Sequence, residues 1–203
     1  MKLRHLILLA LLAVSATPAL AQRPRSESRF FRTCDSVGPL TKLEEFNARW
    51  ETVIVRGSTH IMTTLRADNG LADVNAIELR DESNGTHATG VVIELRAANR
   101  QEPSRQDEST IFIDYEEIDP LIAAWDRVAH TDDTTTKLNI FESHYRSRGD
   151  MEISVFRQAP GSAVAAAVSG GICNRVKLYL SLDELTKLRW MVVQAKAKLD
   201  ELK

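Results

Sequence analysis

The sequence predicts an α+β fold built from antiparallel strands. We expect two successive strands-then-helix units (ββββα twice), with the helices packed on the sheet and a short N-terminal helix. Three observations favour this fold: short β-rich runs bounded by Gly and Asn-Gly, two amphipathic helix patterns that each follow a strand, and a capping box that begins at Thr41. With 43% hydrophobic residues, the chain can bury one core, so residues 41–203 are expected to form a single domain.

The first 21 residues have the order of charges and apolar residues that is typical of a secretory signal. Lys2 and Arg4 precede the apolar run 6–14, and small residues lead up to a cleavage point between Ala21 and Gln22. The run is shorter than the roughly 20 residues that a membrane span needs, so no membrane span is expected. The mature protein is therefore expected to be periplasmic or secreted.

Residues 22–40 are polar and predict an extended N-terminal arm, which contains Cys34. The other cysteine, Cys173, lies near the opposite end of the chain. In an oxidising compartment the two form a candidate disulfide, which would stabilise the fold by about 4 to 5 kcal/mol because it closes a long loop. The alternative is two unrelated thiols. A catalytic cysteine has less support, because no histidine is near either one in sequence.

The first unit begins with a short helix, which the capping box of Thr41 and Glu44 predicts to end near Trp50. We expect breaks at Gly57 and at the hairpin signals Asn69-Gly70 and Asn84-Gly85, and a polar loop over 100–109. The predicted strands are 50–56, 58–65, 74–80, 91–96 and 111–113. Asp114 is the predicted cap of the helix that follows, whose apolar stripe is Ile118, Leu121, Ile122, Trp125 and Val128.

The second unit follows the same plan. Its predicted strands are 138–145, 151–156, 164–168 and 176–180, and Ser181 caps a helix that ends near Leu202. Residues 111–118 align with 178–185 without a gap, which indicates a duplication with halves at about 50–130 and 136–203. The alternative is coincidence, because strand, capping box and amphipathic helix are common pieces.

The C-terminal helix has an apolar stripe with alternating spacings of three and four residues. This pattern predicts packing on the sheet of its own domain, and the alternative is a homodimer through the C-terminal helix. The stripe consists of Leu185, Leu188, Val192, Ala195, Leu199 and Leu202.

No group of residues has the spacing of a catalytic, cofactor-binding or metal site. His130 with Asp132 and Asp133 lies at a helix end, where the helix dipole explains a histidine. The acid pairs Glu116-Glu117 and Asp183-Glu184 fall in first helical turns, which also favour acids.

Two short matches are interpreted as turns. Asn84-Gly85-Thr86 has the form of a glycosylation sequon, and Arg148-Gly149-Asp150 is a tripeptide that some adhesion receptors bind. Each lies between two predicted strands, where a turn is needed.

The charge of the mature chain disfavours nucleic acid as a partner. Cleavage after residue 21 removes Lys2 and Arg4 from 26 basic residues and none of the 28 acidic ones, which leaves a net charge of −4. An acidic chain lacks the positive field that supplies most non-specific phosphate affinity.

Several segments resemble a family of small secreted bacterial proteins with no assigned activity. They are 113–119, 141–150, 180–185 and 194–200, and the similarity covers most of 41–200. The doubled strands-then-helix order is also similar to Whirly and PUR-type single-strand binding domains, at the level of topology. Fold similarity of this kind does not transfer a function.

We therefore expect an exported, non-enzymatic binding or structural module whose sheet presents a surface to a protein, a glycan or a small apolar ligand. The alternatives are a hydrolase-like enzyme whose site forms only in space, from Asp114, Glu117, His144 or Tyr145, and a single-strand nucleic-acid-binding domain.

Overall fold

The structure of the protein is a computed structural model that describes residues 40–61, 63–99, 106–132, 134–172 and 174–203. These residues fall within one compact unit. The predicted signal 1–21 with its cleavage point, the arm before residue 40, and both Cys34 and Cys173 lie outside the described residues. Within the described ranges, no helix is both long enough and apolar enough to cross a membrane.

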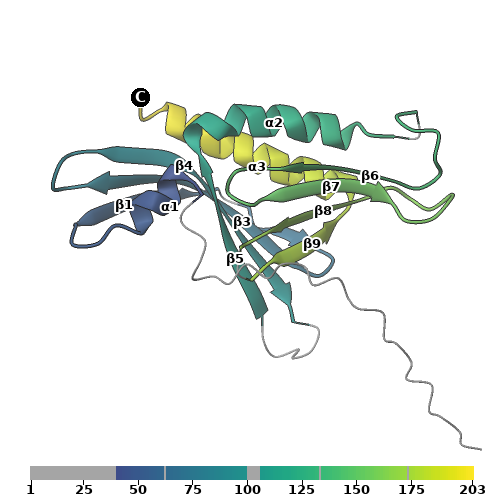
Figure 1. The fold of residues 1–203 in the computed structure, drawn as a ribbon, viewed down its shortest axis with the longest axis horizontal. Helices are drawn as coiled ribbons and strands as arrows, with labels where there is room; N and C mark the ends of the chain where they lie inside the picture. Colours follow the sequence, from purple (N-terminus) through teal and green to yellow (C-terminus); the bar gives the residue numbers. More distant parts are fainter. Residues whose placement is uncertain (1–39, 62, 100–105, 133, 173) are drawn as a thin grey trace, which may run out of the picture. The chain divides into compact units, whose positions relative to one another are not determined.

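The first half of the chain forms sheet A, which is antiparallel and has five strands (Figure 1). The strand order is β1-β3-β4-β5, and β2 pairs with the part of β3 that β1 leaves free. The strands are β1 (Ile54–His60), β2 (Leu65–Ala67), β3 (Gly70–Asp81), β4 (His87–Ala98) and β5 (Gln106–Asp114).

The second half forms sheet B, a four-stranded antiparallel meander in the order β6-β7-β8-β9. The strands are β6 (Phe141–Arg146), β7 (Glu152–Arg157), β8 (Ala165–Gly170) and β9 (Val176–Leu180). Both halves therefore run strands first and helix last. Sheet A has five strands, as many as were predicted individually for the first half and one more than the ββββα plan.

Three helices complete the fold: α1 (Lys42–Asn47), α2 (Tyr115–Ala129) and α3 (Leu182–Asp200). α1 and α3 begin at complete capping boxes, in which the side chains of Thr41 and Ser181 each accept a hydrogen bond from the backbone N–H of the glutamate three residues later. α2 and α3 lie against each other on the same side of the two sheets (Figure 1).

Each long helix packs partly on strands of the other half. α2 follows β5 yet contacts β6 and β7, and α3 follows β9 yet contacts β1, β2 and β3. Both sheets and both helices contribute to one buried cluster, in which Trp125 of α2 is fully buried. Because burying a large apolar side chain contributes about 1.5–3 kcal/mol, this shared cluster couples the stability of the two halves.

The apolar stripe of α3 packs inside the chain's own core. Leu185, Leu188, Val192, Ala195 and Leu199 are all buried there, whereas Leu202, the last member of the predicted stripe, is 61% exposed. Packing within the chain, rather than pairing with a second helix, therefore accounts for the heptad-like spacing.

A smaller apolar cluster lies on the other face of sheet A, where α1 covers part of the sheet. Leu43 and Phe46 of α1 pack there against Ile77, Leu79 and Val92. Both faces of β3 and β4 are thus apolar near α1, which explains why these strands lack strict alternation.

The predicted boundaries need correction at three places in sheet A. Gly57 does not break a strand, since β1 runs through it. Gly70 lies in β3 rather than in the turn, and a Cβ there would overlap the Arg96 carbonyl oxygen. Residues 106–109 were expected in a loop but belong to β5, because their backbones pair with β4 and override the polar composition.

The Asn84-Gly85 hairpin is present, but it is not a type I′ turn. Gly85 alone has a positive φ, 70°, in a loop that joins Asp81 to His87. Asp81 accounts for the longer loop: its carboxylate accepts hydrogen bonds from the Ser83 backbone N–H (2.9 Å) and the Asn84 side-chain amide (3.0 Å).

Candidate functional site

Sheet B has one face in the core, and its opposite face is exposed at the outer strands but buried at the centre, where Ser154, Ala167 and Ser169 are at most 4% exposed. Alternate residues point to opposite faces, and Ile153, Val155, Val168 and Leu178 join the helices in the shared core. We call the opposite side the outer face of sheet B. It carries Glu142, His144 and Arg146 on β6, Glu152, Ser154 and Phe156 on β7, Ala165, Ala167 and Ser169 on β8, and Lys177 and Tyr179 on β9.

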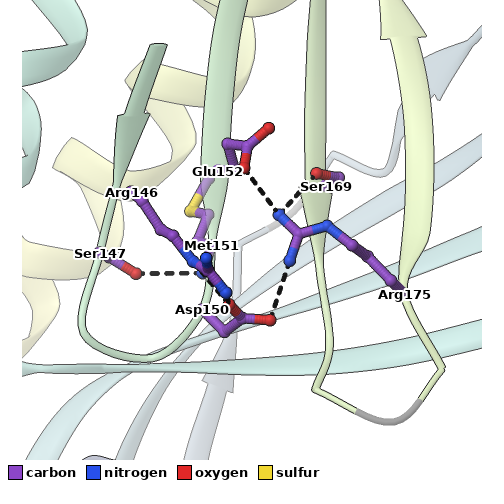
Figure 2. Close-up of polar contacts among 7 residues, drawn as sticks. All are labelled: Arg146, Ser147, Asp150, Met151, Glu152, Ser169 and Arg175. Atoms are coloured by element: carbon purple, nitrogen blue, oxygen red, sulfur yellow. Dashed lines mark hydrogen bonds and ion pairs between the residues drawn. The ribbon is translucent and has the colours of Figure 1, made fainter. Parts of the chain in front are cut away.

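One end of this face is a network of ionic hydrogen bonds around Asp150 (Figure 2). Asp150 lies in the turn between β6 and β7 with a φ of 64°, and it is only 4% exposed. Its carboxylate accepts from Arg146 Nε (2.7 Å) and from Arg175 Nη1 (2.9 Å). Arg175 also donates through Nη2 to Glu152 and to the Ser169 hydroxyl, both at 3.1 Å.

The network joins three segments: the β6–β7 turn, the inner strand β8 and the segment that leads into β9 (Figure 2). Its two arginines are balanced by two carboxylates, so it presents little net charge. The Asp150 carboxylate, the acidic group of the Arg148-Gly149-Asp150 tripeptide, is buried and held by two arginines. It is therefore not free to bind an adhesion receptor. We infer that the network holds the β6–β7 turn, β8 and the segment before β9 in place.

The same turn is also fixed to α2 and β5. The backbone N–H of Arg148 donates to Glu117 Oε1 (3.1 Å), while the other Glu117 oxygen is buried without a hydrogen bond. Burial therefore raises the pKa of the Glu117 carboxyl above its usual value. Gly149 packs so closely on the Phe112 carbonyl oxygen that a Cβ would overlap it.

The other end of the outer face is an open pocket of about 320 Å³. Phe156 and Tyr179 form part of its wall, and the Lys177 ammonium lies 5.8 Å and 5.5 Å from the centres of their rings. Ile140, 55% exposed, and Glu142 lie at its rim. Among the described residues, no carboxylate forms an ion pair with Lys177.

Of the residues proposed for a site assembled in space, Asp114 and Glu117 lie near enough for their charges to interact, but among the described residues no hydrogen bond joins any two of the four. Asp114 occupies the cap position of α2, but its carboxylate makes no cap bond there and instead accepts from the backbone N–H groups of Lys42 (2.9 Å) and Leu43 (3.0 Å). It therefore joins α1 to α2, which corrects the predicted capping role. His144 and Tyr145 are neighbours in sequence and point to opposite faces of β6, since Tyr145 packs on the core.

The other candidate groups have structural partners. Glu116 pairs with Lys42, which lowers the pKa of Glu116, and Glu184 completes the capping box of Ser181. A ring nitrogen of His130 lies 2.6 Å from the Asp126 carbonyl oxygen. Within the described part of the chain, no three His, Cys, Asp or Glu residues are placed to hold a metal ion.

The comparisons with known proteins do not narrow the function. Neither the protein families, nor the curated proteins, nor the solved structures with which the chain was compared include a match.

Sequence reasoning missed the residues that distinguish the outer face of sheet B. Arg175, Lys177 and Tyr179 recur at every second position, so a period-2 analysis of β9 would have placed all three on one face. The role of Asp150 had no such signal, because its partner Arg175 is 25 residues away and meets it only through the meander.

Proposed function

We propose that the protein is an exported, non-enzymatic binding module that takes its ligand on the outer face of sheet B. The signal predicted for residues 1–21 supports an extracytoplasmic location, in the periplasm or outside the cell. The groups best suited to chemistry, Asp114, Glu117 and Asp150, are each occupied by structural hydrogen bonds. What the face offers instead is a rigid surface with a cation beside aromatic rings.

The observation that carries the proposal is Lys177. A charged side chain is expected to find a carboxylate or water, yet Lys177 extends over two aromatic rings in an open pocket. The pocket lies at the outer strands of the sheet, where Glu142 and Lys177 are exposed. Apolar surface with a few placed polar groups is typical of ligand sites.

A homodimer through the C-terminal helix would have to use the solvent side of α3. The buried stripe is already occupied by the chain's own core, and the large apolar side chains left exposed on that helix are Leu182, at its first residue, and Trp190, which is 50% exposed. This makes Trp190 a useful control for the sheet.

The proposal is tested by binding of the mature protein to arrays of glycans, peptides and fatty acids. We expect one class to bind, Tyr179→Ala to weaken that binding, and Trp190→Ala, which removes an exposed aromatic residue elsewhere, to leave it unchanged. Turnover of a hydrolase substrate that a single substitution abolishes would overturn the non-enzymatic proposal. Intact Met1 on protein recovered from the cytosol, detected by mass spectrometry, would overturn the proposed location.

A further inference from the structure

We infer that the pocket formed by Phe156, Lys177 and Tyr179 takes an acidic sugar, that is, a saccharide ring that carries one carboxylate. This inference rests on the proposed binding role of the outer face of sheet B and names its ligand class. It combines the charge that the face leaves uncompensated with the kind of surface that surrounds that charge.

The charges of the face favour a ligand with a single negative group at this position. Arg146 and Arg175 are neutralised by Asp150 and Glu152, with contacts of 2.7 to 3.1 Å to the two carboxylates. Two cations line the pocket: Arg157, which lies over the Phe141 ring, and Lys177, which lies over Phe156 and Tyr179. Among the described residues, no carboxylate forms an ion pair with Lys177. A ligand carboxylate could therefore pair with it without displacing a protein carboxylate.

The same charges disfavour a polyanion such as single-stranded nucleic acid. Glu142 lies at the rim of the pocket and would repel a second phosphate. Proteins that bind nucleic acid normally use several cations in a row along the phosphate backbone. On this face Arg146 and Arg175 are already paired with carboxylates of the protein.

The surroundings of Lys177 suit a sugar ring. Tyr179 is partly exposed and Phe156 is nearly buried, so the rings offer a wall and a floor against which the C–H face of a sugar can pack. The volume of about 320 Å³ is at the lower end of ligand pockets, which fits one sugar ring. Glu142 and Gln158 line the same pocket and can hydrogen-bond to hydroxyl groups.

The test is calorimetric titration of the folded mature protein with a galacturonate oligosaccharide and with the neutral galactose oligosaccharide of the same length. Wild type should bind the acidic oligosaccharide more tightly. Lys177→Gln should weaken that binding about tenfold or more, the effect of losing a charged hydrogen bond, and should leave binding of the neutral sugar unchanged. Lys187→Gln, an exposed lysine of α3, is the matched control and should change neither.

The outcomes separate this inference from the proposed function. Equal affinity for the two sugars, or no effect of Lys177→Gln, overturns the inference, while loss of binding in Tyr179→Ala would still support the face as a binding surface. Binding of neither sugar overturns the inference as well. Tight, steeply salt-dependent binding of a thymidine oligonucleotide that Lys177→Gln weakens would identify a polyanion ligand and contradict the charge argument. Sugar binding that Tyr179→Ala and Lys177→Gln both leave intact overturns both proposals.

Discussion

Asp150 shows how a single residue fixes the geometry of the outer face of sheet B. It lies in the turn with a positive φ, and its carboxylate is held by Arg146 of β6 and by Arg175 of the segment that leads into β9. A non-glycine residue in this region of φ is uncommon, and Asn and Asp tolerate it better than most. The charge and the backbone conformation of this residue can therefore be separated by substitution.

We expect Asp150→Asn to lower the free energy of unfolding by about 2 to 3 kcal/mol, because asparagine keeps the backbone conformation but leaves Arg146 and Arg175 without their shared carboxylate. The loss should be smaller than for a fully buried ion pair, since both arginines are partly exposed. Urea denaturation measures it. Asp68→Asn, in an exposed turn, is the control, and equal stability of the two variants would show that the network contributes nothing.

Glu117 makes stability depend on pH in the opposite direction from an ordinary ion-paired acid. Burial raises its folded-state pKa above the usual 4.5, so the folded protein holds the proton more tightly than the unfolded chain does. Its favourable contribution is therefore present below pH 4.5 and is lost as the pH rises through the folded-state pKa.

Denaturation of wild type and Glu117→Gln across this pH range should show the effect. The wild type should lose stability relative to the variant as the pH rises from 4.5 upward, because glutamine does not titrate and can still accept the hydrogen bond from Arg148. A difference that stays constant with pH, or that grows in favour of wild type, would show that burial does not dominate at this carboxyl.

At the scale of elements, the β6–β7 hairpin depends on close backbone contact with β5. Gly149→Ala should lower the free energy of unfolding by about 2 kcal/mol or more, because its Cβ would overlap the Phe112 carbonyl oxygen. Gly57→Ala is the control, since a Cβ there lies 4.0 Å from the nearest backbone atom, and it should change stability by less than about 1 kcal/mol. Thermal melts that rank the two variants equally would contradict the contact.

The elements also show what the sequence could and could not predict. The strands-then-helix order, the Thr41 and Ser181 caps and the buried stripe of α3 all follow from local patterns that repeat within a few residues. The run of β5 into 106–109 was missed, since pairing with β4 rather than composition decides it. Asp114 is the N-cap residue of α2, as predicted, but the bonds of its carboxylate to the start of α1 could not be predicted, because Lys42 and Leu43 are about 70 residues away.

At the scale of the whole molecule, the two halves are joined by exchanged helix contacts and by one core. The pairing of Cys34 with Cys173, both outside the described residues, stays a prediction.

Reduction of the mature protein should therefore lower its free energy of unfolding by up to about 4 to 5 kcal/mol, the chain-entropy value for so long a loop. Denaturation with and without reductant measures the change, and the Cys34→Ser/Cys173→Ser double variant, with no thiol to reduce, is the control. Two titratable thiols in the unreduced, denatured protein would contradict the disulfide.

The outer face of sheet B is the centre of the functional proposal, and amide chemical-shift mapping tests it most directly. During titration with the galacturonate oligosaccharide, shifts should concentrate on the strands that carry Phe156, Ala167, Lys177 and Tyr179. Shifts centred instead on the larger pocket of about 430 Å³ between α1, β4 and the start of α2, lined by Lys42, His87 and Glu116, would contradict it.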